Sequence, residues 1–453
     1  MRSTLVLFLT LGTLALSPIS YAEPLRAGVA KADITPNGSV LQWGYESRKT
    51  PATGTLDPLY ARVLVLEAGK TRLALVTVDL GRSFGPASLQ RLRDSARASS
   101  GISCLLVAAS HTHSAPEVRD DYPEGPPAWE QEALTRIEKA IEEAIKGMQD
   151  ARIGTGTGSV YVAHNRLRTE PDGSVTWFER NLTHVPTSPV DPTVSVIRID
   201  RTDGTPIAVL TNYACHPVVF GPDNLRYSAD FPAVMNSTVE HEIAGGVLSF
   251  FLQGAPGDLN PYYAVTPLEQ DAIKWRDWTG ETLGREAARV AKQIHTDADP
   301  HPRIDFREDT MNVRLRWNEE KFRAALVKFM GPKALDEYGN QIKPEFPISV
   351  TGVLINRQIA FMTVPGEPFV DFQTNWRDRC PVRSSFLLGY TNGYYGYFPT
   401  IRAASLGGYG AASASTWVEP GTGERIVDRA VIMIYQMLGS LTDIPDELRR
   451  KVF

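Results

Sequence analysis

The chain has 453 residues, of which 42% are hydrophobic and 22% are charged, and its formal net charge is -5 at pH 7. This is the composition of an ordinary globular protein that is long enough to bury a large hydrophobic core. The mildly acidic balance excludes a protein that binds nucleic acid through a basic surface.

The first 22 residues have the pattern of a signal for export. Arg2 is followed by an apolar stretch at 5–16 and by a small-x-small tripeptide at 20–22. A basic start, an apolar segment too short to span a bilayer and such a tripeptide are typical of a cleavable signal peptide. We therefore predict cleavage after residue 22, a periplasmic or secreted protein, and one domain over 23–453. The alternative is an uncleaved anchor. No later stretch approaches the length of a membrane span.

Short apolar runs recur along the rest of the chain, and each ends in polar or Gly/Pro-rich residues. Their length and their β-branched content predict strands that are buried on both faces. We expect such strands within 62–69, 72–81, 103–110, 206–217, 246–258, 357–368 and 384–396.

Helical patterns lie between several of these runs. Residues 127–148, 318–330 and 423–438 carry apolar side chains three and four residues apart, and the first of these segments has an acidic start. Strands that alternate with helices favour an α/β domain, with a mixed β-sheet core flanked by helices.

Polar side chains follow the apolar runs at the places where open α/β sheets bind their ligands, beyond the carboxyl ends of the strands. Three of the eight histidines of the chain have such a position. In chain order these residues are His111 and His113, His216, Asp258, Glu367, Tyr394 and Tyr397.

The pair His111 and His113 is spaced by one residue. In an extended segment, side chains two residues apart face the same way, so both imidazoles can enter one pocket. A zinc site needs neutral imidazoles or anionic oxygens that converge on one point, with a position open for water when the metal is catalytic. Each residue alone has a plainer interpretation: a hydrogen-bonded pair at a strand end, a core or capping histidine at 216, and a solvated glutamate at 367. Their joint position at strand ends favours a metal site.

Three cysteines are too few and too scattered for a disulfide framework. Cys104 and Cys215 lie in apolar runs, where a free cysteine behaves as a small buried hydrophobic residue. A catalytic thiol at Cys215 is disfavoured, because adjacent residues of a strand point to opposite faces and His216 is its neighbour.

Several longer motifs occur in order along the mature chain. They are GVAKADITP, DPLYARVLVLEAG, SHTHSAP, HNR, NYACHPVVFG, QGAPGDLNP, PGEPF and NGYYGYFPT, with GGYGAAS after them. This series resembles the signature of the catalytic N-terminal domain of the neutral/alkaline non-lysosomal ceramidases. The resemblance covers most of the mature chain and implies the mixed α/β fold of that domain, with a metal site at the carboxyl ends of the strands.

The resemblance implies one zinc ion per chain, with four protein ligands. By motif these ligands are His111, His216, Glu367 and Tyr397. Tyr397 follows from matching GYYGY to a family motif whose last tyrosine binds the metal, and Tyr394 is the alternative.

The resemblance also assigns catalytic roles to His113, Arg166 and Tyr409. Zinc lowers the pKa of a bound water from about 15.7 toward about 7, and the resulting hydroxide can attack an amide carbonyl. His113 is suited to accept a proton and return it to the departing amine. Arg166 and Tyr409 would donate hydrogen bonds to the tetrahedral oxyanion, a kind of contact worth about 3 to 4 kcal/mol. Tyr409 lies twelve residues after Tyr397, which is also the step in the family pattern.

Four further polar residues are candidates for ligand orientation or substrate binding. Asp79 and Asp230 can orient ligand imidazoles, with helix capping as the plainer alternative. Asp258 and Asn260 lie in the GDLNP turn. Asn260 takes the place of a family serine that is credited with a catalytic or substrate-binding role. An amide forms hydrogen bonds but is no nucleophile, so a mechanism through metal-activated water survives the change and an acyl-serine mechanism does not.

The chain ends at Phe453, soon after the predicted helix at 423–438. By comparison with full-length ceramidases, we expect a short form that lacks their additional C-terminal domain. The predicted function is an exported zinc-dependent hydrolase that cleaves the amide bond of a lipid-like N-acyl amine, and ceramide is one candidate. The same metal could serve an ester, lactone or phosphoester, and a non-catalytic metal-stabilised binding protein is the alternative of another class. The sequence does not indicate an oligomeric state.

Overall fold

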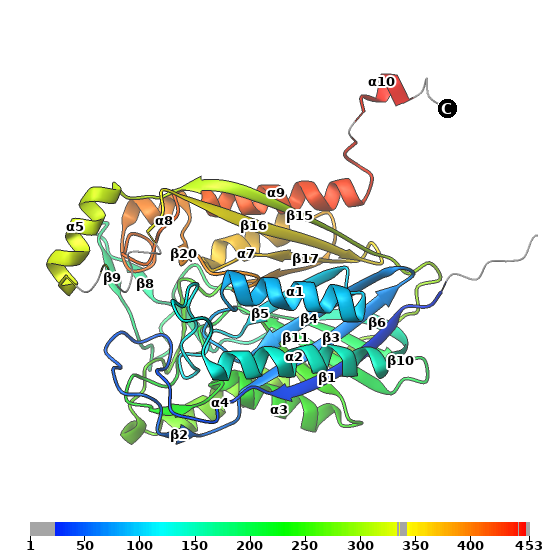
Figure 1. Ribbon diagram of the computed structural model, residues 1–453, viewed down its shortest axis with the longest axis horizontal. Helices are drawn as coiled ribbons and strands as arrows, with labels where there is room; N and C mark the ends of the chain where they lie inside the picture. Colours follow the sequence, from blue (N-terminus) through cyan, green and yellow to red (C-terminus); the bar gives the residue numbers. More distant parts are fainter. Residues whose placement is uncertain (1–22, 333–334, 336–341, 443, 450–453) are drawn as a thin grey trace, which may run out of the picture.

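The computed structural model describes residues 23–332, 335, 342–442 and 444–449. The predicted signal peptide at 1–22 therefore lies outside the described residues. Two β-sheets form the centre of the molecule, and helices cover the outer side of each (Figure 1). The predicted α/β class, with a mixed sheet flanked by helices, is confirmed.

The larger sheet has eight strands in the order β13-β11-β10-β6-β1-β3-β4-β5. At each edge the last two strands are parallel, β4 with β5 and β11 with β13, whereas the inner pairs are antiparallel. The strands are β1 (Arg26–Asp33), β3 (Tyr60–Ala68), β4 (Thr71–Val78), β5 (Cys104–Ala109), β6 (Gln149–Ser159), β10 (Thr193–Arg201), β11 (Pro206–Tyr213) and β13 (Leu248–Gln253).

The smaller sheet has four strands in the order β15-β16-β17-β19. They are β15 (Ile304–Arg314), β16 (Glu345–Ile355), β17 (Ile359–Thr363) and β19 (Ser384–Leu388). Its inner face packs against the larger sheet, where Phe361 and Leu388 share an apolar core with Leu66, Leu210 and Phe250. The predicted strands at 357–368 and 384–396 therefore belong to a second sheet.

Three pairs of helices complete the layers. The helices α1 and α2 cover the β1 and β3–β5 half of the larger sheet, and α3 and α4 cover its other half. The helices α7 and α9 cover the outer face of the smaller sheet. Their bounds are α1 (Pro86–Ser100), α2 (Ala128–Lys146), α3 (Phe231–Ile243), α4 (Ala272–Gln293), α7 (Val370–Arg379) and α9 (Thr422–Met437). Within the described part of the chain, no helix combines the length and apolar content needed to cross a bilayer.

The remaining elements are short or peripheral. The helices are α5 (Glu319–Met330), α8 (Ile401–Leu406), α10 (Asp446–Arg449) and a 3-10 turn at Leu268–Gln270. The short strand pairs are β2 (Gly54–Thr55) with β12 (Arg226–Tyr227), β7 (Ala163–Asn165) with β14 (Leu259–Pro261), β8 (Leu167–Thr169) with β9 (Val175–Trp177), and β18 (Glu367–Pro368) with β20 (Tyr397–Phe398).

The segment after β19 joins two edges of the larger sheet that stand at opposite ends of its strand order. The amide of Gly389 donates to the carbonyl of Gln253 at the end of β13 (2.9 Å), and the Asn392 side chain accepts from the amide of Val107 in β5 (2.9 Å). The Gln253 side chain also donates to the carbonyl of Ser110 (2.9 Å). These bonds bring the carboxyl ends of β5, β13 and β19 to one place.

Candidate metal centre

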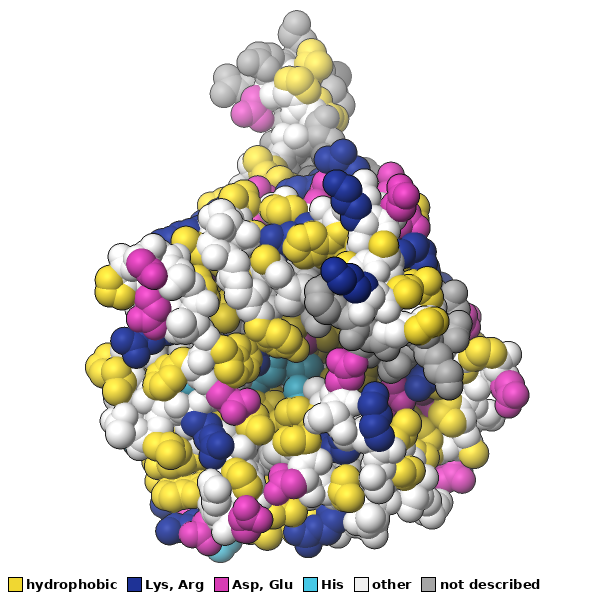
Figure 2. Space-filling view, turned by 90° about the vertical axis from the view of Figure 1, so that its left-hand side faces the viewer, with side chains coloured by type: hydrophobic (Ala, Val, Ile, Leu, Met, Phe, Trp, Pro, Cys, Tyr) yellow, Lys and Arg dark blue, Asp and Glu magenta, His cyan; other side chains and the backbone are white. Residues whose placement is uncertain are grey.

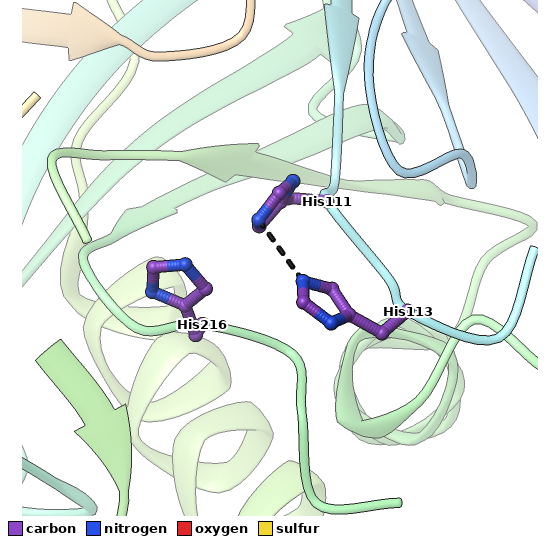
Figure 3. A group of neighbouring side chains, drawn as sticks. All are labelled: His111, His113 and His216. Carbon is purple, nitrogen blue, oxygen red and sulfur yellow. Dashed lines mark hydrogen bonds between the residues drawn. The ribbon is translucent and has the colours of Figure 1, made fainter. Parts of the chain in front are cut away.

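Three histidines converge beyond the ends of β5 and β11. His111, His113 and His216 each offer a ring nitrogen, and these nitrogens lie within 4.8 Å of one another. Figure 3 shows the three rings turned toward a common centre. The predicted convergence is therefore present, but the extended geometry predicted for the first pair is wrong. His111 has a φ of 71°, so the chain turns at this residue and does not continue the strand.

Backbone carbonyls fix the orientation of two of these rings. His111 Nδ1 bonds to the carbonyl of Gly81, and His216 Nδ1 bonds to those of Pro256 (2.7 Å) and Leu259 (2.9 Å). A carbonyl oxygen only accepts, so each Nδ1 carries a proton, and in the neutral form of each ring Nε2 then presents a lone pair. Histidines that bind metals have this same second contact to a carbonyl or carboxylate.

The carboxylate of Glu367 faces those two lone pairs. Its Oε2 lies 3.0 Å from Nε2 of His216 and 3.5 Å from Nε2 of His111. Burial alone would raise the pKa of Glu367, but the two histidines outweigh it and hold the pKa well below its usual range. Burial lowers the pKa of His216 to about 4, so this imidazole is neutral at neutral pH.

The Glu367 carboxylate and the Nε2 atoms of His111 and His216 thus face one another in a buried place. The negative charge of the carboxylate has to be offset there, either by a proton on an imidazole or by a cation between the groups. Imidazole nitrogen and carboxylate oxygen are ligands that zinc takes in proteins. The donor set of His111, His216 and Glu367 therefore fits a divalent metal ion such as zinc.

Two tyrosines from the segment after β19 contact the same carboxylate. The hydroxyl of Tyr394 donates to Glu367 Oε1 (2.5 Å), and that of Tyr390 donates to Oε2 (3.1 Å). The Tyr390 ring also stacks on His111, with ring centres 4.1 Å apart. Sequence reasoning missed Tyr390, although it is the first tyrosine of the apolar run at 384–396 in which a strand was predicted.

Tyr397, the predicted fourth ligand, lies beside Glu367 in the β18–β20 pair. Its hydroxyl accepts a hydrogen bond from Nη2 of Arg166 (3.0 Å). The ring of Tyr409 lies 5.5 Å from that of Tyr397, and the Arg166 guanidinium lies 5.6 Å from each ring. The structure thus groups these three residues, whereas Tyr394 and Tyr390 are the tyrosines that donate to the Glu367 carboxylate. Tyr397 as a ligand stays a prediction, with Tyr394 as the alternative.

His113 differs from the other two histidines. Its Nε2 lies 3.2 Å from Nε2 of His111, but its buried Nδ1 has no hydrogen-bond partner among the described residues. Burial lowers the pKa of His113 well below its ordinary value. In the described part of the chain no backbone carbonyl contacts this ring, so the backbone does not fix which nitrogen carries the proton. This is the property that a proton carrier needs.

Gly44 lies against the ring of His113. A Cβ at this position would lie 2.3 Å from the imidazole, and the φ of 98° also disfavours a side chain. We expect Gly44→Ala to displace His113, to reduce turnover and to destabilise the fold by about 1 to 3 kcal/mol. Denaturant unfolding and turnover measure both effects. Gly38→Ala is the matched control, because a Cβ there meets no atom within 4 Å; equal behaviour of the two variants would contradict the prediction.

The predicted aspartates hold the surrounding backbone. Asp79 accepts hydrogen bonds from the amide of Tyr60 (2.9 Å) and from Arg62 (3.2 Å), and Asp230 accepts from the amide of Phe231 (2.7 Å) at the start of α3. Neither of these contacts involves an imidazole. The predicted orienting role falls to the backbone carbonyls described above, and Asp230 has the alternative role of a helix cap.

Asp258 is a buried residue of the GDLNP turn. It accepts hydrogen bonds from the Asn165 side chain (2.7 Å) and from the amide of Val370 (2.8 Å), and burial raises its pKa to about 6. Cys215 is also buried, and burial raises its pKa well above its ordinary value, which disfavours a thiolate nucleophile there.

Two of the candidate metal ligands, His111 and Glu367, line a cavity of about 330 Å³. In Figure 2 histidine side chains lie at the bottom of a hollow that is bordered largely by hydrophobic side chains. The residues that line the cavity include His111, His113, Glu367, Tyr394, Tyr397 and Tyr409, together with Leu41, Trp43 and Trp417.

The fold and the site together define an α/β protein with a candidate metal centre at the carboxyl ends of its strands. The family model described as neutral/alkaline non-lysosomal ceramidase, N-terminal, matches residues 25–267, which is more than half of the chain. The chain therefore belongs to the neutral/alkaline non-lysosomal ceramidase family, as the motifs predicted.

Two solved structures share this fold. A neutral ceramidase from Pseudomonas aeruginosa superposes with a TM-score of 0.71 and 20% identity, over 93% of this chain and 76% of that chain. A ceramidase complexed with C2 superposes with the same TM-score, 18% identity and the same coverage. At these identities the similarity shows the fold, so the activity has to be argued from the site.

Proposed function

We propose that this protein is an exported zinc-dependent hydrolase that cleaves the amide bond of a lipid-like N-acyl amine. The observation that carries the proposal is the meeting of His111, His216 and Glu367 beside a cavity that His111 and Glu367 line, in a member of the ceramidase family. The proposed export depends on the signal-like sequence at 1–22 alone.

The metal would be held by His111, His216 and Glu367, with Tyr397 or Tyr394 as a further ligand. Zinc bound there supplies Lewis acidity, which makes water nucleophilic at neutral pH. The backbone carbonyls behind the two imidazoles keep their Nε2 lone pairs directed at the ion. The ligands are therefore preorganised before substrate arrives.

His113 is placed to move the proton that amide hydrolysis requires. It lines the cavity, lies next to the ligand His111 and has an unoccupied Nδ1. In the proposed reaction it takes a proton from the attacking water and delivers it to the leaving nitrogen. An amine leaves poorly without that proton, so this step matters more for an amide than for an ester.

Tyr409 and Tyr397 form the wall of the cavity on the side of Arg166. The hydroxyl of Tyr409 is a donor that can face the developing oxyanion, and the buried Arg166 guanidinium adds positive charge in a region of low dielectric. The apolar side chains Leu41, Trp43 and Trp417 also line the cavity, which supports a substrate with an acyl chain.

The test is a screen of N-acyl amines with detection of the free amine, alongside esters with the same acyl chains. We expect close to one zinc per chain, release of amine, loss of activity with a chelator and recovery when zinc is added back. Metal analysis and turnover are measured on the same preparation. Hydrolysis of the esters alone would make the protein an esterase, and bound metal without any turnover would leave a binding protein.

A further inference from the structure

Asn260 is the residue at the position of the family serine. Both polar atoms of its side chain form hydrogen bonds to other protein groups. It lies on the short strand β14 and is 1% exposed. Its Oδ1 accepts a hydrogen bond from Nη1 of Arg166 (3.1 Å), and its Nδ2 donates to the backbone carbonyl of Glu179 (3.1 Å). The amide therefore bridges Arg166 and the segment after β9. Both of its polar atoms are directed at protein groups.

The orientation of the Arg166 guanidinium in turn depends on hydrogen bonds to neutral acceptors. Besides Asn260, its guanidinium donates to the carbonyl of Gly257 (2.7 Å) and to the hydroxyl of Tyr397 (3.0 Å). Within the residues that the structure describes, its buried Nε has no hydrogen-bond partner. A buried guanidinium that is held by so few acceptors loses much of its orientation when one of them is removed.

The planar guanidinium links the Asn260 contact to the cavity. Its five donors are fixed in one plane, so the bond from Nη1 to Asn260 sets the direction of Nη2. Nη2 is the group that holds the hydroxyl of Tyr397, and Tyr397 lines the cavity with Glu367. Three side chains thus form a chain of contacts from β14 to the cavity wall.

We propose that Asn260 is a positioning residue, which holds Arg166 in the plane that brings Nη2 to Tyr397 and does not itself touch the substrate. The inference rests on the proposed function, because Arg166 and Tyr397 matter for turnover only if the site hydrolyses a substrate. A serine could not take over both contacts in the same way, because its single hydroxyl is shorter than the amide and lacks the amide's separate donor and acceptor.

The test compares Asn260→Leu, which removes both polar atoms at similar volume, with Asn260→Asp, which keeps an acceptor for Arg166. We expect Asn260→Leu to lower kcat by about 10- to 100-fold with KM within about twofold. Asn260→Asp should restore most of the loss. Asn236→Leu is the matched control: Asn236 is also a buried asparagine but lies on α3, and its substitution should leave kcat unchanged.

A second readout needs neither metal nor substrate. In denaturant unfolding of the metal-free protein, the effects of Asn260→Leu and Arg166→Met on the unfolding midpoint should be non-additive, because each removes the same bond. If Asn260→Leu fails to fold, Asn260→Ala gives the same comparison.

The outcomes separate this inference from the proposed function. An active wild type with kcat unchanged in Asn260→Leu, or with Asn260→Asp as impaired as Asn260→Leu, overturns the positioning role alone. Additive effects on unfolding also overturn it. A wild type that hydrolyses no amide overturns the proposed function and removes the basis of the inference with it.

Discussion

The His216→Ala variant is expected to lose its zinc and its amide hydrolysis together. His216 is fully buried, its Nδ1 donates to two backbone carbonyls, and its Nε2 lies 3.0 Å from the Glu367 carboxylate. Loss of a mere outer partner of a metal ligand costs about 10- to 100-fold in metal affinity, so loss of the ligand itself should cost more. Metal content after dialysis and turnover at saturating substrate measure the two effects.

His241→Ala is the control for this substitution, because His241 is an exposed histidine on α3. It should keep one zinc per chain and full activity. The removal of an imidazole from His216 also leaves a cavity, so zinc content has to be compared at matched folded fraction. Full zinc occupancy in a folded His216→Ala variant would show that the metal is held elsewhere.

The sequence predicted the fold class and several buried strands, but it did not predict how the strands are divided between two sheets. Buried strands that end in polar residues were recognisable because their apolar runs were continuous, as in β5, β11 and β13. The assignment of strands to sheets was not recognisable, since nearly all positions of β17 and β19 are buried, as they are in strands of the larger sheet such as β5 and β13. An apolar run indicates that a strand is buried on both faces, but it does not indicate which sheet the strand belongs to.

Elements with weaker apolar patterns escaped prediction for identifiable reasons. The strand β15 alternates between buried and exposed positions and contains several charges, so no apolar run marks it. The helix α4 contains Gly280 and Gly284, which lower helix propensity. In the fold these glycines allow close packing on α3, since a Cβ on Gly280 would lie 2.5 Å from Val234. Tertiary contact thus explains residues that local propensity disfavours.

The positions of single residues in the site also could not be predicted from their spacing in the sequence. Spacing alone could bring His111 and His113 into one pocket, but not through the left-handed turn that the structure has at His111. Nor could spacing separate Tyr390, Tyr394 and Tyr397, because the loop that carries them turns at two non-glycine residues with positive φ, Tyr390 and Asn392. Which hydroxyl reaches the carboxylate depends on that loop and on its bonds to two sheet edges, which lie far apart in sequence.

The His113→Ala variant is expected to keep its zinc and to lose about 10²- to 10⁴-fold in kcat, the usual contribution of a positioned acid/base group. The histidines that would hold the ion have their Nδ1 fixed by backbone carbonyls, whereas His113 has a buried Nδ1 without a partner. A ligand benefits from a fixed tautomer, but a proton carrier has to change its protonation during turnover. Zinc analysis with kcat and KM on an amide and its matched ester provides the measurement.

The ester comparison adds a second criterion. An alkoxide leaves more readily than an amine, so the loss of a group that protonates the leaving atom should be smaller for the ester. Added imidazole should restore part of the amide turnover in the zinc-loaded variant. The nitrogens of all three histidines lie within 4.8 Å of one another, which is also compatible with three histidine ligands. Release of zinc from His113→Ala, with equal losses for amide and ester, would make His113 a ligand, and the leaving nitrogen would then need a proton from another group.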